Sequence, residues 1–165
     1  MSIAESMLPE FDHEMASTRK MLERVPDEKL AWSPHPKSYT LQKLAVHVAH
    51  LPTWATITLT TDSFTVGGPF QWPTAANRKE ILALFDTSST DARAALARES
   101  DPEIMKPWSL VAGGTALFTM PKVAVLRSFV MNHLIHHRAQ LSVYLRMNDI
   151  AIPGMYGPSA DDAGG

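Results

Sequence analysis

Apolar side chains recur every three to four residues over four segments of the chain, which predicts four helices. The expected helices cover roughly residues 2–25, 38–60, 77–99 and 119–148. The connections between them are rich in proline and glycine, which interrupt helices. Pro52 is expected to kink or divide the second helix, because a proline inside a helix removes a backbone hydrogen bond. The pattern therefore predicts an all-α fold, a four-helix bundle with irregular connections.

A short segment between the third and fourth helices loses this periodicity and is expected to form a small hairpin near 108–118. Ser109–Val111 and Thr115–Phe118 lie on either side of Gly113 and Gly114. Two short runs separated by paired glycines are typical of strands joined by a tight turn. The sequence thus predicts one small β element beside the helices.

The length of 165 residues predicts one domain covering 1–165, with a loose, turn-rich tail at 157–165. Hydrophobic residues make up 45% and charged residues 19%, an ordinary globular balance. The net charge of -2 argues against nucleic acid as a partner.

Apolar runs fall far short of the roughly 20 residues that cross a bilayer, so no membrane association is expected. The N-terminus lacks a signal-peptide pattern, and we expect a cytoplasmic protein.

The chain contains no cysteine, so histidine is the residue type most informative about chemistry. Successive residues of a helix are about 100° apart. On the fourth helix, His137 then falls about 15° from the middle of the apolar stripe, His133 about 55° and His136 about 115°. On the second helix, His47 falls about 80° from the stripe and His50 about 140°, near the polar side. His133 and His137 therefore point toward the core.

Two inward-facing histidines at i and i+4 have the spacing that places two zinc ligands on one helix face. A buried imidazole needs partners for both ring nitrogens, and a metal ion provides one for each ring. His47 can supply a third nitrogen from a neighbouring helix, which leaves an open position typical of catalytic sites. The sequence predicts a metal site at His47, His133 and His137, against the alternative of individually hydrogen-bonded histidines. The remaining histidines are expected at the surface or in loops: His13, His35, His50 and His136.

Other polar side chains around the predicted site have less specific interpretations. Arg138 and Arg146 are expected to form ion pairs between helices or at the surface. Gln140, near the edge of the apolar stripe, either supports a metal ligand or belongs to a helix interface. Asp12 and Glu14 of the first helix are candidate general bases whose position relative to the histidines is open. No catalytic residue is assigned beyond the expected metal ligands.

Four stretches of the chain resemble the DinB-like (damage-inducible) superfamily of bacterial four-helix-bundle metalloproteins. They are LPEFDHEMASTRKMLERVP, KLAWSPHPKSYTLQKLAVHVAHLPTW, NHLIHHRAQLSVYLR and IPGMYGPSADD, which together span about residues 8–162. The third stretch, with HHRAQL followed by YLR and a late YGPS, is the most specific. The resemblance implies a homodimer and a zinc or nickel ion held by three histidines. The histidines that match the family pattern are His47, His133 and His137.

Characterised members of this superfamily include thiol-dependent transferases and isomerases that use mycothiol, bacillithiol or glutathione. The resemblance therefore implies a metal-dependent transferase that acts on a small-molecule substrate with a low-molecular-weight thiol. The thiol has to come from a cosubstrate, because the chain lacks cysteine. Two alternatives remain at this stage. One is a metal-dependent hydrolase with water as the nucleophile, and the other is a non-catalytic metal- or ligand-binding stress protein.

Overall fold

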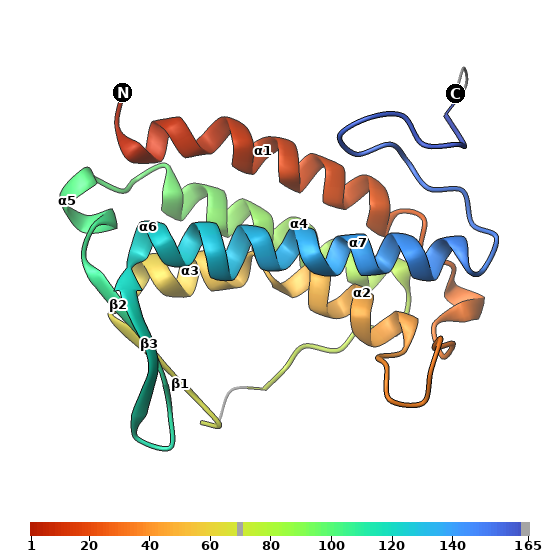
Figure 1. Cartoon of the computed structure of the whole chain (residues 1–165), viewed down its shortest axis with the longest axis horizontal. Coiled ribbons are helices and arrows are strands. Elements are labelled where there is room, and N and C mark those ends of the chain that lie inside the picture. The colour runs from red at the N-terminus through yellow and green to blue at the C-terminus, as the bar shows by residue number, and fades with distance from the viewer. Residues whose placement is uncertain (69–70, 163–165) are drawn as a thin grey trace.

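The computed structural model describes residues 1–68 and 71–162. Its helices lie side by side in rows, where a row is one long helix or consecutive helices placed end to end, and a small sheet projects from one end (Figure 1). The predicted helical bundle is thus confirmed in part: the chain is mostly helical, but the hairpin expected near 108–118 belongs to a three-stranded sheet, so the fold is not purely α-helical. The elements, in chain order, are α1 (Ile3–Leu22), η1 (Asp27–Lys29), α2 (Leu41–His50), α3 (Thr53–Thr60), β1 (Ser63–Val66), α4 (Arg78–Leu96), α5 (Asp101–Ile104), β2 (Pro107–Ala112), β3 (Thr115–Pro121), α6 (Lys122–Val125), η2 (Leu126–Asn132) and α7 (His133–Arg146).

Three of the long helices begin at a side chain that accepts a hydrogen bond from the first helical turn. Ser2 accepts from the backbone N–H of Glu5 at 3.1 Å, and the Glu5 carboxylate accepts from the Ser2 N–H at 2.6 Å. Thr40 caps α2 and Asn77 caps α4 in the same way. These side chains satisfy backbone N–H groups that have no partner inside the helix, so the helix starts can be recognised in the sequence.

Pro52 divides the second helical segment, as its position in the apolar pattern predicts. α2 ends at His50 and α3 begins at Thr53. Leu51 and Pro52 keep right-handed helical backbone angles. The two helices therefore form one bent row along the bundle (Figure 1).

The last helical row is continuous from α6 to α7, but its middle part is wound differently. η2 is a π-helical segment, with wider turns than an α-helix. π-helical segments occur frequently at functional sites. This one ends at Asn132, directly before His133, the first residue of α7. The row begins at Lys122 and not near residue 119, because residues 115–121 pair in the sheet.

The sheet contains the predicted hairpin and one strand that the sequence analysis missed. β2 and β3 pair antiparallel, with Ser109 opposite Thr119, and positive φ angles at Gly113 and Gly114 form the turn. β1 pairs parallel to β2, so the strand order in the described residues is β1-β2-β3. The fully buried Trp108 donates its indole N–H to Thr61 Oγ1 at 3.1 Å and anchors the sheet to the end of α3.

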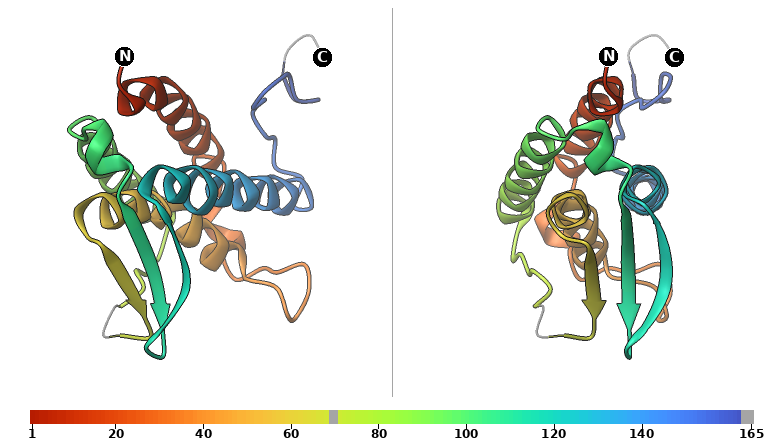
Figure 2. Two further views of the ribbon diagram at one scale, coloured as in Figure 1. Left: turned by 60° about the vertical axis from the view of Figure 1, so that its left-hand side comes forward. Right: turned by 90° about the vertical axis from the view of Figure 1, so that its left-hand side faces the viewer.

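The hydrophobic core fills the space between the helical rows, which surround it when the molecule is viewed end-on (Figure 2, right). Side chains from α2, α4 and α7 are among the most deeply buried. No helix in the described residues is long and apolar enough to cross a membrane. The largest fully buried side chains include Trp108, Phe85, Met21, Leu44, Leu51, Ile81, Leu134 and Leu141.

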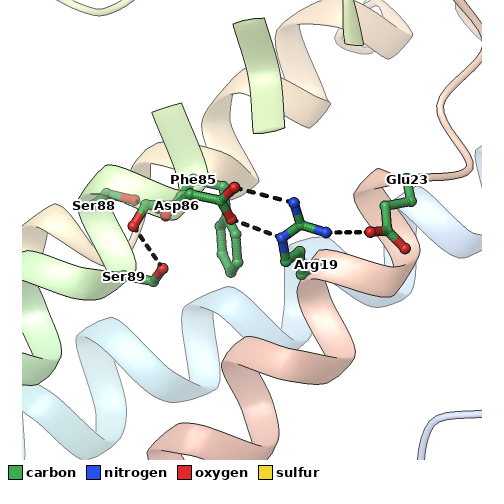
Figure 3. A network of polar contacts seen from close by, with 6 residues as sticks. All are labelled: Arg19, Glu23, Phe85, Asp86, Ser88 and Ser89. Carbon is green, nitrogen blue, oxygen red and sulfur yellow. Dashed lines mark hydrogen bonds and ion pairs between the residues drawn. The ribbon is translucent and has the colours of Figure 1, made fainter. Parts of the chain in front are cut away.

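A polar network on the surface joins α1 to α4 (Figure 3). The Arg19 guanidinium donates to both carboxylate oxygens of Asp86, at 2.8 and 3.1 Å, and also pairs with Glu23. Two residues after Asp86, the buried Ser88 hydroxyl donates to the backbone carbonyl of Ala49 at 2.7 Å. α4 is therefore fixed against α1 by the ion pair and against α2 by a buried hydrogen bond.

The C-terminal segment forms hydrogen bonds within itself and an ion pair with α7, while the loose tail expected at 157–165 stays a prediction. Ser159 donates its hydroxyl to the Ile152 carbonyl at 2.7 Å, and Asp161 forms an ion pair with Arg146. The Asp161 carboxylate also accepts from the Ile152 N–H at 3.0 Å. These contacts link residues 152–161 to one another and to the end of α7. Residues 163–165 of the predicted tail lie outside the described residues.

Candidate metal centre

The structure brings together the three histidines that the sequence singles out, although they lie up to ninety residues apart. One nitrogen from each of His47, His133 and His137 lies within 4.8 Å of the other two. Nε2 of His47 is 3.4 Å from Nε2 of His133. Two nitrogens that bind one ion tetrahedrally at about 2.1 Å lie about 3.4 Å apart. The arrangement therefore fits three nitrogen ligands of a single metal ion.

Two helices of the bundle position these rings. His47 extends from α2, while His133 and His137 lie one turn apart at the start of α7, with ring centroids 4.7 Å apart. The His47 ring is 5.2 Å from that of His133 and 4.5 Å from that of His137. The i and i+4 spacing keeps the α7 pair on one face, and the packing of α2 against α7 adds the third ring.

The ring nitrogens facing away from the cluster determine which nitrogen is left for a metal. Nδ1 of His137 lies 2.7 Å from the Oε1 atom of Gln140, so Nε2 of His137 remains available. Nδ1 of His133 is buried. Burial lowers the pKa of His133, and an interaction with the backbone of Phe129 raises it in part. A partner on the outer nitrogen orients a metal-binding imidazole and selects its tautomer. The sequence allows Gln140 either to support a metal ligand or to belong to a helix interface. Its contact with His137 agrees with the first interpretation.

All three histidines are held in the neutral form, which is the form that binds metals. Burial lowers the pKa of His47 to about 4, with smaller contributions from the charges of His137, His133 and His50. Burial is also the main reason that the pKa values of His133 and His137 are lowered. In the described part of the chain, no carboxylate contributes to the pKa shifts of these three histidines. Each ring can therefore offer one unprotonated nitrogen to a metal near neutral pH.

The metal-free protein is expected to lose stability as the pH falls from 7 toward 4. In the unfolded chain a histidine titrates near about 6.5, whereas folded His47 stays neutral down to a pKa of about 4. Between these values the unfolded state binds more protons, so the free energy of unfolding falls with pH, while above about 6.5 it is unaffected by this residue. Denaturant unfolding of chelator-treated protein at several pH values measures the effect. His47→Gln should reduce the slope, and an unchanged slope would contradict the assignment.

The other histidines follow the sequence analysis with one exception. His136 is exposed beside His137, and His13 and His35 are exposed, as predicted. His50 is buried, which corrects its predicted place at the surface. Residues 72–75 return over the polar side of α2, and the Trp72 ring lies edge-on at 5.8 Å from His50. The position of His50 around the helix axis does not by itself reveal that residues 72–75 lie over it.

Both candidate general bases of α1 are engaged in ion pairs with arginines. Asp12 accepts two hydrogen bonds from Arg93 of α4, at 2.7 and 2.8 Å. Glu14 is buried and pairs with Arg138 of α7 at 2.7 Å. Arg138 and Arg146 thus form ion pairs, as the sequence analysis expects. Neither Asp12 nor Glu14 belongs to the group of side chains that can hold a metal ion.

A tyrosine near the C-terminus completes the buried ion pair and was missed by the sequence analysis. The Tyr156 hydroxyl donates to the Glu14 carboxylate at 2.9 Å and accepts from Arg138 at 2.7 Å. Arg138 also donates to Thr18 Oγ1 and to the Glu14 carbonyl, both at 3.1 Å. The YGPS stretch was a signal for this residue, but its partners cannot be identified from spacing alone. The network fixes α7 next to His137.

An open cavity of about 680 Å³ adjoins the histidine cluster and has His47 in its wall. The outer face of α2 forms one side, and residues 72–75 form the other. Its size is typical of pockets for small molecules, which range from about 300 to 1,000 Å³. The cluster therefore borders a space in which a small molecule can reach it.

Four helical rows with three convergent imidazoles from two of them define a helical-bundle protein with a candidate metal centre. The chain belongs to the DinB family, whose model matches residues 1–163. It is 24% identical over 156 residues to the uncharacterized protein YrdA of Bacillus subtilis (strain 168), covering 94% of this chain and 89% of that protein. The resemblance recognised in the sequence is thereby confirmed.

Solved structures of DinB-like proteins share the fold. The protein from Bacillus cereus ATCC 10987 has a TM-score of 0.71 and 25% sequence identity, and the match covers 94% of this chain and 98% of that one. The protein YjoA from Bacillus subtilis has a TM-score of 0.72 and 17% identity, with 91% and 96% covered. The overall fold therefore resembles an architecture already observed in experimental structures.

Proposed function

We propose that the protein binds a divalent metal ion, zinc or nickel, through His47, His133 and His137. We further propose that it uses the ion as a transferase acting with a low-molecular-weight thiol. The observation that carries the proposal is the convergence of three neutral imidazole nitrogens within 4.8 Å of one another. Imidazole suits both metals. Three protein ligands would leave room for a further ligand on a bound ion, as in catalytic centres, and His47 also lines the cavity.

A metal ion at such a centre lowers the pKa of a thiol and so raises the reactive thiolate fraction. The chain's own contribution is to hold the three imidazoles and to keep them unprotonated. In the reaction, the thiol sulfur forms a bond to an electrophilic carbon, and the leaving group departs with its bonding electron pair. The thiol proton passes to solvent. The absence of cysteine from the chain supports an external thiol.

Metal-dependent hydrolysis has less support than thiol transfer. A hydrolase of this type needs a general base near the metal-bound nucleophile. Asp12 and Glu14, the carboxylates considered for that role, are paired with Arg93 and Arg138. In the described residues, no carboxylate joins the histidine cluster. The following experiment distinguishes a metal-dependent transferase from a protein that binds metal without catalysis.

The transferase proposal is tested with zinc- and nickel-loaded protein, a panel of thiols and a general electrophile. Mycothiol, bacillithiol and glutathione are each combined with 1-chloro-2,4-dinitrobenzene, and conjugate formation is followed by absorbance. We expect one thiol to give a metal-dependent rate above the uncatalysed reaction, and His137→Ala to abolish it. His136→Ala serves as the matched control and should retain the rate. Metal binding without conjugation by any thiol would favour the non-catalytic role.

A further inference from the structure

The cavity beside the histidine cluster has an unusual charge distribution. Among the described side chains that line it, Lys43 is the only one with a permanent charge at neutral pH, and none is Asp or Glu. Much of the remaining wall is apolar or aromatic, with contributions from Val46, Trp72 and Tyr39. A cavity with a single cation and no compensating acid favours ligands that carry a negative charge.

Lys43 interacts with an aromatic ring, whereas several arginines of the bundle pair with carboxylates. Its Nζ atom lies over the Tyr39 ring, 4.4 Å from the ring centroid. In the described part of the chain no carboxylate pairs with it, whereas Arg19, Arg93 and Arg127 each pair with one. The Tyr39 ring holds the ammonium group at the cavity without neutralising its charge.

The opposite wall is fixed in place against α2. The Gln42 side chain donates to the backbone carbonyl of Ala75 at 2.7 Å, which ties residues 72–75 to the helix. The Trp72 ring rests edge-on against His50 at 5.8 Å and lies 6.5 Å from Trp54, yet 56% of the residue stays exposed. The partly exposed Trp72 side chain therefore forms part of the cavity wall, where aromatic or apolar groups of a ligand can pack against it.

We propose that this cavity binds a small organic anion, whose carboxylate pairs with Lys43 and whose planar apolar body packs on Trp72. Bound in this way, the molecule lies beside His47 and next to the proposed metal position. The inference deepens the proposed function and rests on it in assigning this molecule as the substrate. The binding of the anion itself depends on Lys43 and Trp72 alone.

The test compares 2-naphthoate with 2-naphthamide, which have the same ring system but differ in charge. Their affinities for the zinc-loaded protein are measured by calorimetry, and the zinc content of each sample is determined. We expect naphthoate to bind about two- to fivefold tighter, as for ion pairs that involve an exposed lysine. Lys43→Met should remove this preference, Lys43→Arg should keep it, and Trp72→Ala should weaken both compounds. Lys20→Met, on the distant face of α1, is the matched control and should behave like the unchanged protein.

Repeating the measurement on chelator-treated protein separates Lys43 from the metal ion as the source of the preference. If the preference persists without metal and disappears in Lys43→Met, the pocket is supported even where the protein fails to bind zinc, which would refute the proposed function alone. If the protein binds zinc but binds both compounds equally, the pocket proposal is wrong and the metal centre stands. A preference that survives Lys43→Met also overturns the proposal.

Discussion

Replacing His137 with alanine is expected to lower zinc affinity by more than 100-fold. The substitution removes one of three imidazole nitrogens that lie within 4.8 Å of one another. Loss of only an outer partner of a ligand typically costs about 10- to 100-fold in metal affinity, so loss of the ligand itself should cost more. His47→Ala and His133→Ala are expected to have similar effects. Competition titration with a zinc indicator measures the affinity of each variant.

The control for this prediction is the neighbouring residue on the same helix. His136 is exposed, and its ring centroid is 4.9 Å from that of His137, but it lies outside the cluster. His136→Ala is therefore expected to change zinc affinity by less than about threefold. Equal losses in His136→Ala and His137→Ala would show that the face of α7 has been assigned incorrectly. Loss of zinc binding in the three cluster variants alone would support the site.

Replacing Arg138 with methionine is expected to destabilise the protein by about 3 to 5 kcal/mol. The side chains of Arg138 and Glu14 are only 3% and 5% exposed, and their charged groups are 2.7 Å apart. Methionine leaves the Glu14 carboxylate buried without its cation, and that uncompensated charge is the main cost. Tyr156 also loses the hydrogen bond that it accepts from Arg138. Denaturant unfolding of metal-free protein measures the change, because bound metal would add to the apparent stability.

Two further variants separate burial of the charge from loss of an ion pair. The double variant Glu14→Met and Arg138→Met removes both charges and should recover much of the loss, since a buried pair often contributes little net stability. Arg93→Met breaks the half-exposed pair with Asp12 and should cost about 1 kcal/mol or less. If Arg138→Met and Arg93→Met reduce the free energy of unfolding equally, the buried network has no special role.

Local features of the sequence were enough to predict most of the helices and the three clustered histidines. The caps at Thr40 and Asn77 and the break at Pro52 act within a few residues of themselves. His133 and His137 are one turn apart, so their common face follows from helix geometry once the helix is recognised. The π-helical segment before them ends at Asn132 and leaves their relative phase unchanged.

The features that the sequence analysis missed depend on contacts between distant segments. β1 pairs with β2, with Ser63 opposite Ser109, so the strand depends on a partner far away in the sequence. The burial of His50 requires residues 72–75 to fold over α2. Tyr156 reaches Glu14 only because the C-terminal segment returns to α1. The homodimer and the cytoplasmic location remain predictions from the sequence.

The most direct measurement of the central claim is anomalous X-ray diffraction at the zinc edge from crystals of zinc-loaded protein. The account predicts one strong peak per chain, about 2.0 to 2.1 Å from a ring nitrogen of each of His47, His133 and His137. A peak bound by other residues, or no peak among these three rings in a crystal of protein that contains zinc, would contradict it.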